Sequence, residues 1–173
     1  MAKTKAKIAE SAVLKRLEQD RLADAKRQGQ AQFDSIKEMV EALRRANESA
    51  WEKPPEPYGN FDEANEAARQ RIMEDALSVQ VRSGWYTPLT RGERAEQKAA
   101  EYEILLCTGG PACRIVGELN EHGEPESASM EVQDWCQPWT AIRPLVGKQL
   151  GGADDYDSEP ILLEYARCFW FGE

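Results

Sequence analysis

The sequence predicts an α+β fold, in which an antiparallel meander of about four strands packs with helices and follows an N-terminal helical arm. Two observations predict this class. Residues 1–50 are rich in Ala, Lys, Leu, Glu, Gln and Arg, which favour helix. From Ser78 onward, short runs of alternating apolar residues are separated by turn residues, which is typical of strands. With 173 residues, of which 41% are hydrophobic, the chain is long enough for one domain with a core and an extension.

The N-terminal arm is predicted to be two helices or one bent helix. Residues 4–27 contain no Pro or Gly, whereas Gln28-Gly29-Gln30 is expected to break or weaken the helix. The next segment has an apolar helical face made of Phe33, Ile36, Val40 and Leu43. This face either packs on the body of the same chain or binds a partner, which includes a second copy of the protein.

A Pro-rich linker, residues 51–62, is expected to separate the arm at 1–50 from an acidic α+β domain at 63–173. Asn60 or Asp62 is expected to cap a helix that ends near Leu77. A half-buried strand with Val79, Val81 and Trp85 on one face should follow.

Glu101–Cys107 and Arg114–Leu119 are predicted to be two strands of a hairpin around Thr108-Gly109-Gly110-Pro111. The glycines match neither a phosphate-binding loop nor a dinucleotide fingerprint, because strand-like residues follow them where both motifs need a helix. A further strand is expected over 128–135. Ser158 should start a C-terminal helix, with Phe169, Trp170 and Phe171 packed after it.

Charge is distributed unevenly along the chain, whose net charge is −9. Residues 1–48 contain 11 Lys and Arg against 8 Asp and Glu, whereas residues 49–173 contain 11 against 23, which is a net charge of −12. A body of this charge repels a nucleic-acid backbone and attracts basic protein surfaces. The alternative is that the acidic residues only keep the protein in solution.

The cysteines and the single histidine do not form a recognisable catalytic or zinc motif. The four cysteines include no closely spaced pair, so a zinc site is not expected. In the predicted hairpin Cys107 and Cys113 lie near each other, and we expect reduced, mostly buried thiols, although one disulfide is an alternative. His122 lies in a turn of Gly, Pro and Glu and is expected to be solvated. We therefore predict no catalytic residues, no cofactor and no enzyme activity.

One enzymatic alternative is a small divalent-metal-dependent hydrolase or nuclease that uses the carboxylates between Asp154 and Glu159. This segment lacks the fixed spacing of a calcium-binding EF-hand loop, so a solvated loop is the simpler interpretation. We predict no metal site.

Aromatic residues next to acidic turns are the candidates for a binding surface. Tryptophan anchors either a small core or an interface, so each ring has both interpretations. The candidate interface residues are Trp85, Tyr86, Glu118, Glu121, Glu124, Glu126, Trp135, Trp139, Asp154, Asp155 and Asp157.

The stretches VQVRSGWYTP, EYEILLCTGGPACRIVGEL, VQDWCQPWT and LLEYARCFWFGE resemble a family of small uncharacterised bacteriophage and prophage proteins, over about residues 76–173. This resemblance implies a context and transfers no catalytic residues. Acidic phage accessory proteins often block host machinery, including restriction enzymes and CRISPR complexes, and some imitate the charge of DNA.

The sequence hypothesis is therefore an accessory protein that binds and inhibits a host protein, in the cytoplasm of a bacterial cell. Its partner would have a basic, nucleic-acid-binding surface, and the acidic body itself would bind neither nucleic acid nor membrane. The N-terminal helices could pair two copies as a homodimer. A virion assembly factor, with the helical arm as its assembly element, is a further alternative.

Overall fold

The computed structural model describes residues 2–47, 53–85, 98–135, 137–147 and 157–172, with side chains from Leu22 onward. In these residues the helices are α1 (Ala2–Asn47), α2 (Phe61–Asp75) and α3 (Glu159–Ala166), and the strands are β1 (Ser78–Ser83), β2 (Ala99–Cys107), β3 (Ala112–Glu118), β4 (Ser129–Gln133) and β5 (Thr140–Ile142). All neighbouring strands are antiparallel and follow chain order. The predicted α+β meander is confirmed, with β5 as an additional short strand.

The hairpin between β2 and β3 forms at the predicted turn. Gly109 and Gly110 have φ angles of +108° and +95°, a region that favours glycine because it has no Cβ. Cys107 is the register partner of Cys113, after a bulge that begins at Leu105.

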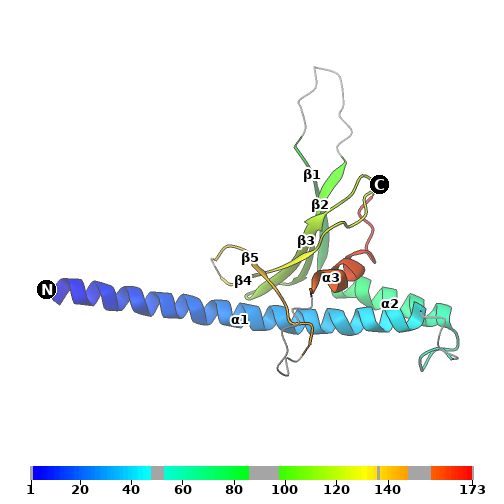
Figure 1. Ribbon diagram of the computed structural model, residues 1–173, viewed down its shortest axis with the longest axis horizontal. Helices are drawn as coiled ribbons and strands as arrows, with labels where there is room; N and C mark the ends of the chain where they lie inside the picture. Colours follow the sequence, from blue (N-terminus) through cyan, green and yellow to red (C-terminus); the bar gives the residue numbers. More distant parts are fainter. Residues whose placement is uncertain (1, 48–52, 86–97, 136, 148–156, 173) are drawn as a thin grey trace, which may run out of the picture.

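Helix α1 is one continuous helix, so the predicted break at Gly29 is wrong. Figure 1 shows that its C-terminal half lies under the body, while its N-terminal half extends beyond the sheet. The glycine is required by packing: a Cβ built on Gly29 would lie 2.5 Å from Ile142 Cδ1 and 2.6 Å from Val132 Cγ1. The missing side chain therefore lets the helix approach β4 and β5 closely, which outweighs its low helix propensity.

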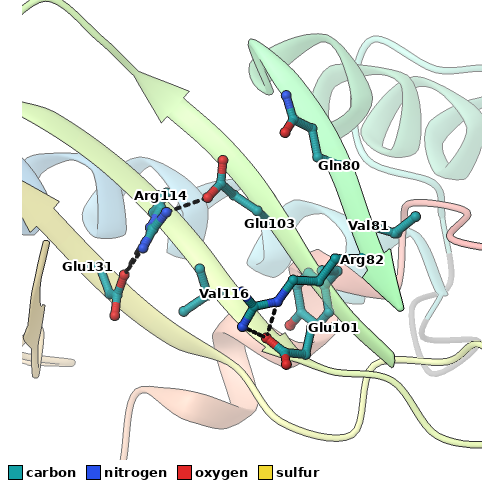
Figure 2. Close-up of a pocket in the computed structure, with 9 residues that line it drawn as sticks. Gln80, Val81, Arg82, Glu101, Glu103, Arg114, Val116 and Glu131 are labelled. Atoms are coloured by element: carbon teal, nitrogen blue, oxygen red, sulfur yellow. Dashed lines mark hydrogen bonds and ion pairs between the residues drawn. The ribbon is translucent and has the colours of Figure 1, made fainter. Parts of the chain in front are cut away.

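The sheet has one covered and one open face. The helices lie on the face that contains Tyr102, Ile104 and Ile115, all of which are buried. The opposite face presents Glu103, Arg114 and other polar side chains (Figure 2). This division follows from the two-residue alternation of strands, as the sequence pattern predicts.

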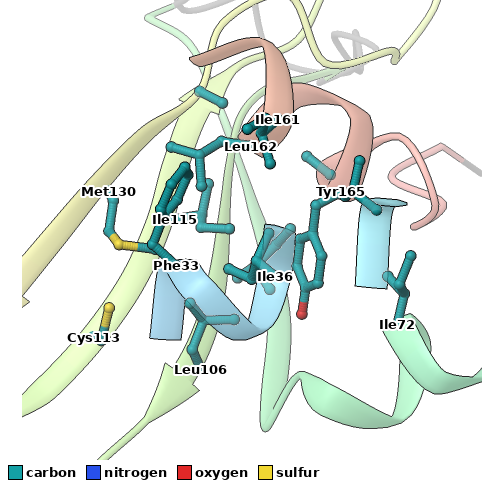
Figure 3. Packing of buried hydrophobic residues seen from close by; sticks show 14 of the residues in the cluster. Phe33, Ile36, Ile72, Leu106, Cys113, Ile115, Met130, Ile161, Leu162 and Tyr165 are labelled. Carbon is teal, nitrogen blue, oxygen red and sulfur yellow. The ribbon is translucent and has the colours of Figure 1, made fainter. Parts of the chain in front are cut away.

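The core lies between α1, the covered face of the sheet and the other two helices. The apolar face predicted on the N-terminal segment is buried there: Phe33 and Ile36 contact the sheet and α3 in the same chain (Figure 3). Tyr165 of α3 is fully buried, and its hydroxyl donates a 2.8 Å hydrogen bond to Asp75 at the end of α2. The core therefore includes residues from both sides of the expected linker.

Local capping follows the sequence in part. Asn60 caps α2 as predicted, and its side-chain oxygen accepts a 2.8 Å hydrogen bond from the Glu63 backbone N–H. Ser158 is the N-cap of α3, but its side chain makes no capping bond, and Asp157 instead accepts from the Glu159 N–H at 3.1 Å.

The fit at Gly29 generates a stability prediction. Gly29→Ala should gain about 1 kcal/mol from helix propensity, but overpacking against the buried, β-branched Val132 should cost about 1–3 kcal/mol. We expect a net decrease in the free energy of unfolding, measured by urea denaturation. Gly147→Ala is the control, because no atom lies within 4 Å of its added Cβ. A more stable Gly29→Ala protein would contradict the close approach.

Candidate protein-binding surfaces

The turn between β3 and β4 has a defined shape that Asn120 maintains. The Asn120 side-chain oxygen accepts hydrogen bonds from the backbone N–H groups of His122, at 2.9 Å, and Glu124, at 3.0 Å. The Asn120 backbone N–H donates to the Glu124 carbonyl at 2.9 Å. On the other side of the turn, the Ser127 hydroxyl accepts a 3.0 Å hydrogen bond from the Glu118 N–H. These local bonds hold the turn in one conformation before any partner binds.

The acidic side chains of this turn face solvent. All four predicted glutamates at this turn are exposed: Glu118, which ends β3, and Glu121, Glu124 and Glu126, which follow it. The Nε2 atom of His122 lies 3.4 Å from Oε1 of Glu121. In the described part of the chain, no Lys or Arg side chain is paired with these four glutamates. The result is a local concentration of negative charge on a rigid backbone.

The C-terminal segment lies beside this turn. The Arg167 side chain donates a 3.5 Å hydrogen bond to the Pro125 carbonyl. The centres of the Phe171 and Tyr102 rings lie 4.7 Å apart. The Tyr102 hydroxyl in turn donates a 2.8 Å hydrogen bond to the Ser127 carbonyl. Phe171 is buried, but Trp170 is 77% exposed, so the prediction that Trp170 is packed is wrong. Trp170 and the four turn glutamates together are called the acidic end below.

The other predicted tryptophans lie elsewhere on the sheet. Strand β1 forms as predicted, but the expectation that it is half-buried is wrong: Val79, Val81 and the following Trp85 are all exposed, because β1 is an edge strand of the sheet. Trp135 and Trp139 belong to the β4–β5 connection, at the opposite end of the sheet from the acidic turn. The 66%-exposed Trp135 lies against the β2–β3 turn, where a Cβ on Gly110 would collide with its indole. The predicted residues therefore do not form one continuous surface.

Three predicted interface residues, Tyr86, Asp154 and Asp155, lie outside the described residues. Asp157 is described, and its carboxylate caps α3. Glu159, from the same acidic segment, accepts a 3.3 Å hydrogen bond from the Ala128 N–H. Within the described residues no group of three or more His, Cys, Asp or Glu side chains is arranged to hold a metal ion.

The open face of the sheet contains a shallow groove of about 390 Å³. Arg114 lines this groove and pairs with Glu103 on one side and with Glu131 on the other, the latter through two bonds of 2.7 and 2.8 Å (Figure 2). Its guanidinium also lies 4.1 Å from the centre of the Trp139 ring. Arg82 and Glu101 form a second, more exposed pair. Because the two arginines offset two of the three carboxylates, the groove has little net charge and is a weaker candidate for a charged partner than the acidic end.

The described thiols have the properties of core residues. Burial, and then the neighbouring Cys107 thiol, raises the pKa of Cys113 from 9.0 to about 12. Burial also raises the pKa of Cys107 and of Cys168. A nucleophilic cysteine needs the opposite shift, because the thiolate is the reactive form. Among the described residues Cys107, Cys113 and Cys168 form no disulfide; Cys113 is buried, whereas Cys107 and Cys168 are half-buried, so the expected burial holds for Cys113 alone.

Comparisons of this chain with protein-family models, with curated proteins and with solved structures found no match. In the described part of the chain, no helix combines the length and apolar composition that a membrane span requires. The surfaces therefore have to be interpreted from their own chemistry.

Sequence reasoning missed the Arg114 cluster and the position of Trp170. The cluster had a signal, since Glu101 and Glu103 alternate with buried residues on β2 and Arg114 lies on the next strand. The position of Trp170 had no such signal in the sequence, because its segment lies beside a turn that is more than 40 residues away along the chain.

The Arg114 cluster generates a second stability prediction. Arg114→Met leaves two partly buried glutamates without their common partner, so we expect a loss of about 1–3 kcal/mol in the free energy of unfolding. Arg82→Met is the matched control on the same face, and its exposed pair should contribute less than about 1 kcal/mol. Equal losses in the two variants would contradict a central role for Arg114.

The raised pKa of Cys113 generates a prediction at alkaline pH. Folding favours the protonated thiol, so this stabilisation is complete below pH 9.0 and is lost as the pH rises toward about 12. In urea denaturation under reducing conditions, the free energy of unfolding should fall less steeply above pH 9 for Cys113→Val than for the wild type. Parallel pH profiles would show that Cys113 does not contribute.

Proposed function

We propose that this protein is a non-catalytic binding protein, and that its acidic end captures a basic surface of another protein. The observation that supports this best is the exposed Trp170, on a C-terminal segment that lies beside a turn with solvated glutamates and a backbone held by Asn120. Tryptophan is among the residues most enriched in binding hot spots, and charged side chains are typical of the rim around such a residue. The body's net charge of −12 favours basic partners and increases their rate of encounter.

The rigidity of the turn supports the same proposal. Ordering a loop upon binding costs free energy, and here hydrogen bonds to Asn120 and Ser127 already order the backbone. The Phe171–Tyr102 contact similarly fixes the chain on which Trp170 is presented. A partner would therefore meet a preformed surface.

The phage or prophage resemblance suggests what kind of partner this is. In that setting the partner is a host protein with a basic, nucleic-acid-binding surface, and covering that surface would inhibit it. The acidic end would then compete with nucleic acid for the same basic side chains.

The test begins with affinity capture from a bacterial lysate at low and high salt, and identification of the retained proteins by mass spectrometry. We expect a nucleic-acid-binding protein that is retained at low salt and lost at high salt, because exposed charges are screened. Its affinity for the purified full-length chain would then be measured by calorimetry. Retention that does not depend on salt, or no retained protein at either salt, would contradict the proposal.

Substitutions in the acidic end give the matching prediction. Trp170→Ala should weaken binding about tenfold or more, as expected for a hot-spot aromatic residue. The double variant Glu121→Gln/Glu126→Gln should cost roughly 1 kcal/mol, or about fivefold, and reduce the salt dependence. Glu38→Gln/Glu66→Gln is the control, because it removes two exposed charges from α1 and α2. Equal weakening by both double variants would indicate an effect of net charge alone.

A further inference from the structure

The outer edge of β1 is an unpaired sheet edge. In the described part of the chain β1 pairs with β2 alone, and it is the first strand in the sheet order. Edge strands are often protected from pairing by charged side chains, above all Lys, by Pro or by a bulge. The β1 sequence, Ser78–Ser83, contains no Pro or Lys, and its one charge, Arg82, and its register shift at Arg82/Ser83 both lie near the end of the strand. Within the described residues, the middle of this edge therefore has neither a pairing strand nor a protecting residue.

The covered face of the sheet is incomplete at this edge. Val79 and Val81 are the register partners of Ile104 and Tyr102, so they lie on the same face as these buried residues. Val79 is nevertheless 38% exposed and Val81 48% exposed. Met73 lies in the last turn of α2 and Leu77 lies just before β1, and more than half of the surface of each residue is exposed. Exposed apolar side chains thus lie on β1 and in the chain just before it.

We propose that β1 pairs with β1 of a second copy of this chain, in an antiparallel arrangement around a two-fold axis at Gln80. The two five-stranded sheets would then form one continuous sheet. The proposal does not depend on the acidic end or its partner.

The residues of β1 fit a second copy of themselves. Around Gln80 the two-fold axis places Val79 opposite Val81 of the second copy on the covered face, and Ser78 opposite Arg82 on the open face. The two Gln80 side chains meet at the axis, where an amide can both donate and accept. No two like charges are opposed. The strand also contains no acidic residue, although the body around it has a net charge of −12.

The arrangement also reduces repulsion and covers exposed apolar groups. Because the two strands are antiparallel, the acidic ends of the two copies point in opposite directions.

The chain after one β1 runs beside the chain before the other β1. The fully exposed Trp85 therefore comes near Met73 and Leu77 of the second copy. A basic partner would find no acidic residue on this edge, so a second copy suits it better.

Cysteine cross-linking tests the register directly. Gln80→Cys places two thiols at the two-fold axis, so mild oxidation of the full chain should give a covalent dimer. Arg82→Cys is the matched control: it faces Ser78 of the second copy and should not cross-link to itself, while the wild type reports cross-linking through native cysteines. Equal cross-linking of both variants, or none for Gln80→Cys, would overturn the proposed register.

Sedimentation of the protein without cross-linking tests the dimer itself. The wild type should show a concentration-dependent monomer–dimer equilibrium. Val79→Lys/Val81→Lys, which opposes lysines across the axis, should be a monomer with an unchanged circular dichroism spectrum. Ala31→Lys/Gln70→Lys adds the same charge at exposed helix positions and should remain dimeric. A wild type that stays monomeric, or a dimer that persists in Val79→Lys/Val81→Lys and so forms elsewhere, would refute β1 pairing.

Discussion

The rest of the structure depends on the close contact between α1 and the sheet. At Gly29 the helix backbone approaches Val132 and Ile142, and one turn later Phe33 enters the core. This contact fixes which face of the sheet is covered, because alternate residues of each strand must point toward the helix or away from it. Helices α2 and α3 then share a core with α1, and the partly buried hydrogen bond from Tyr165 to Asp75 joins them.

Covering one face leaves a sheet whose other face must be compatible with water. The open face meets this constraint with ion pairs, in which Arg114 contacts two carboxylates while Trp139 lies against its guanidinium. Such pairing gives specific geometry and little net charge. The β3–β4 turn instead presents exposed carboxylates that no Lys or Arg of the described residues pairs with. The structure therefore separates charges that organise the sheet from charges that are free to meet a partner.

Local patterns in the sequence predicted the elements, and long-range contacts decided the rest. The Gly-Gly turn, the strands around it and the Asn60 cap depend on residues a few positions apart. Gly29 was misjudged because its role depends on Ile142, which is distant in the sequence. The three-residue β5 is too short for alternation to show. In the candidate site, the acidic turn was found from its charge, whereas exposure of the tryptophans depends on which helix covers which strand.

The length of the covering helices also explains why two surfaces remain available. The helices cover the middle of the sheet but not β1, where Val79 and Val81 stay exposed beside buried neighbours. The acidic end lies two strands away, on residues that the core does not use. A dimer through β1 would therefore leave both acidic ends accessible and point them in opposite directions. Such a dimer could bind two basic sites at once, and linking two weak contacts raises the overall affinity without any new contact.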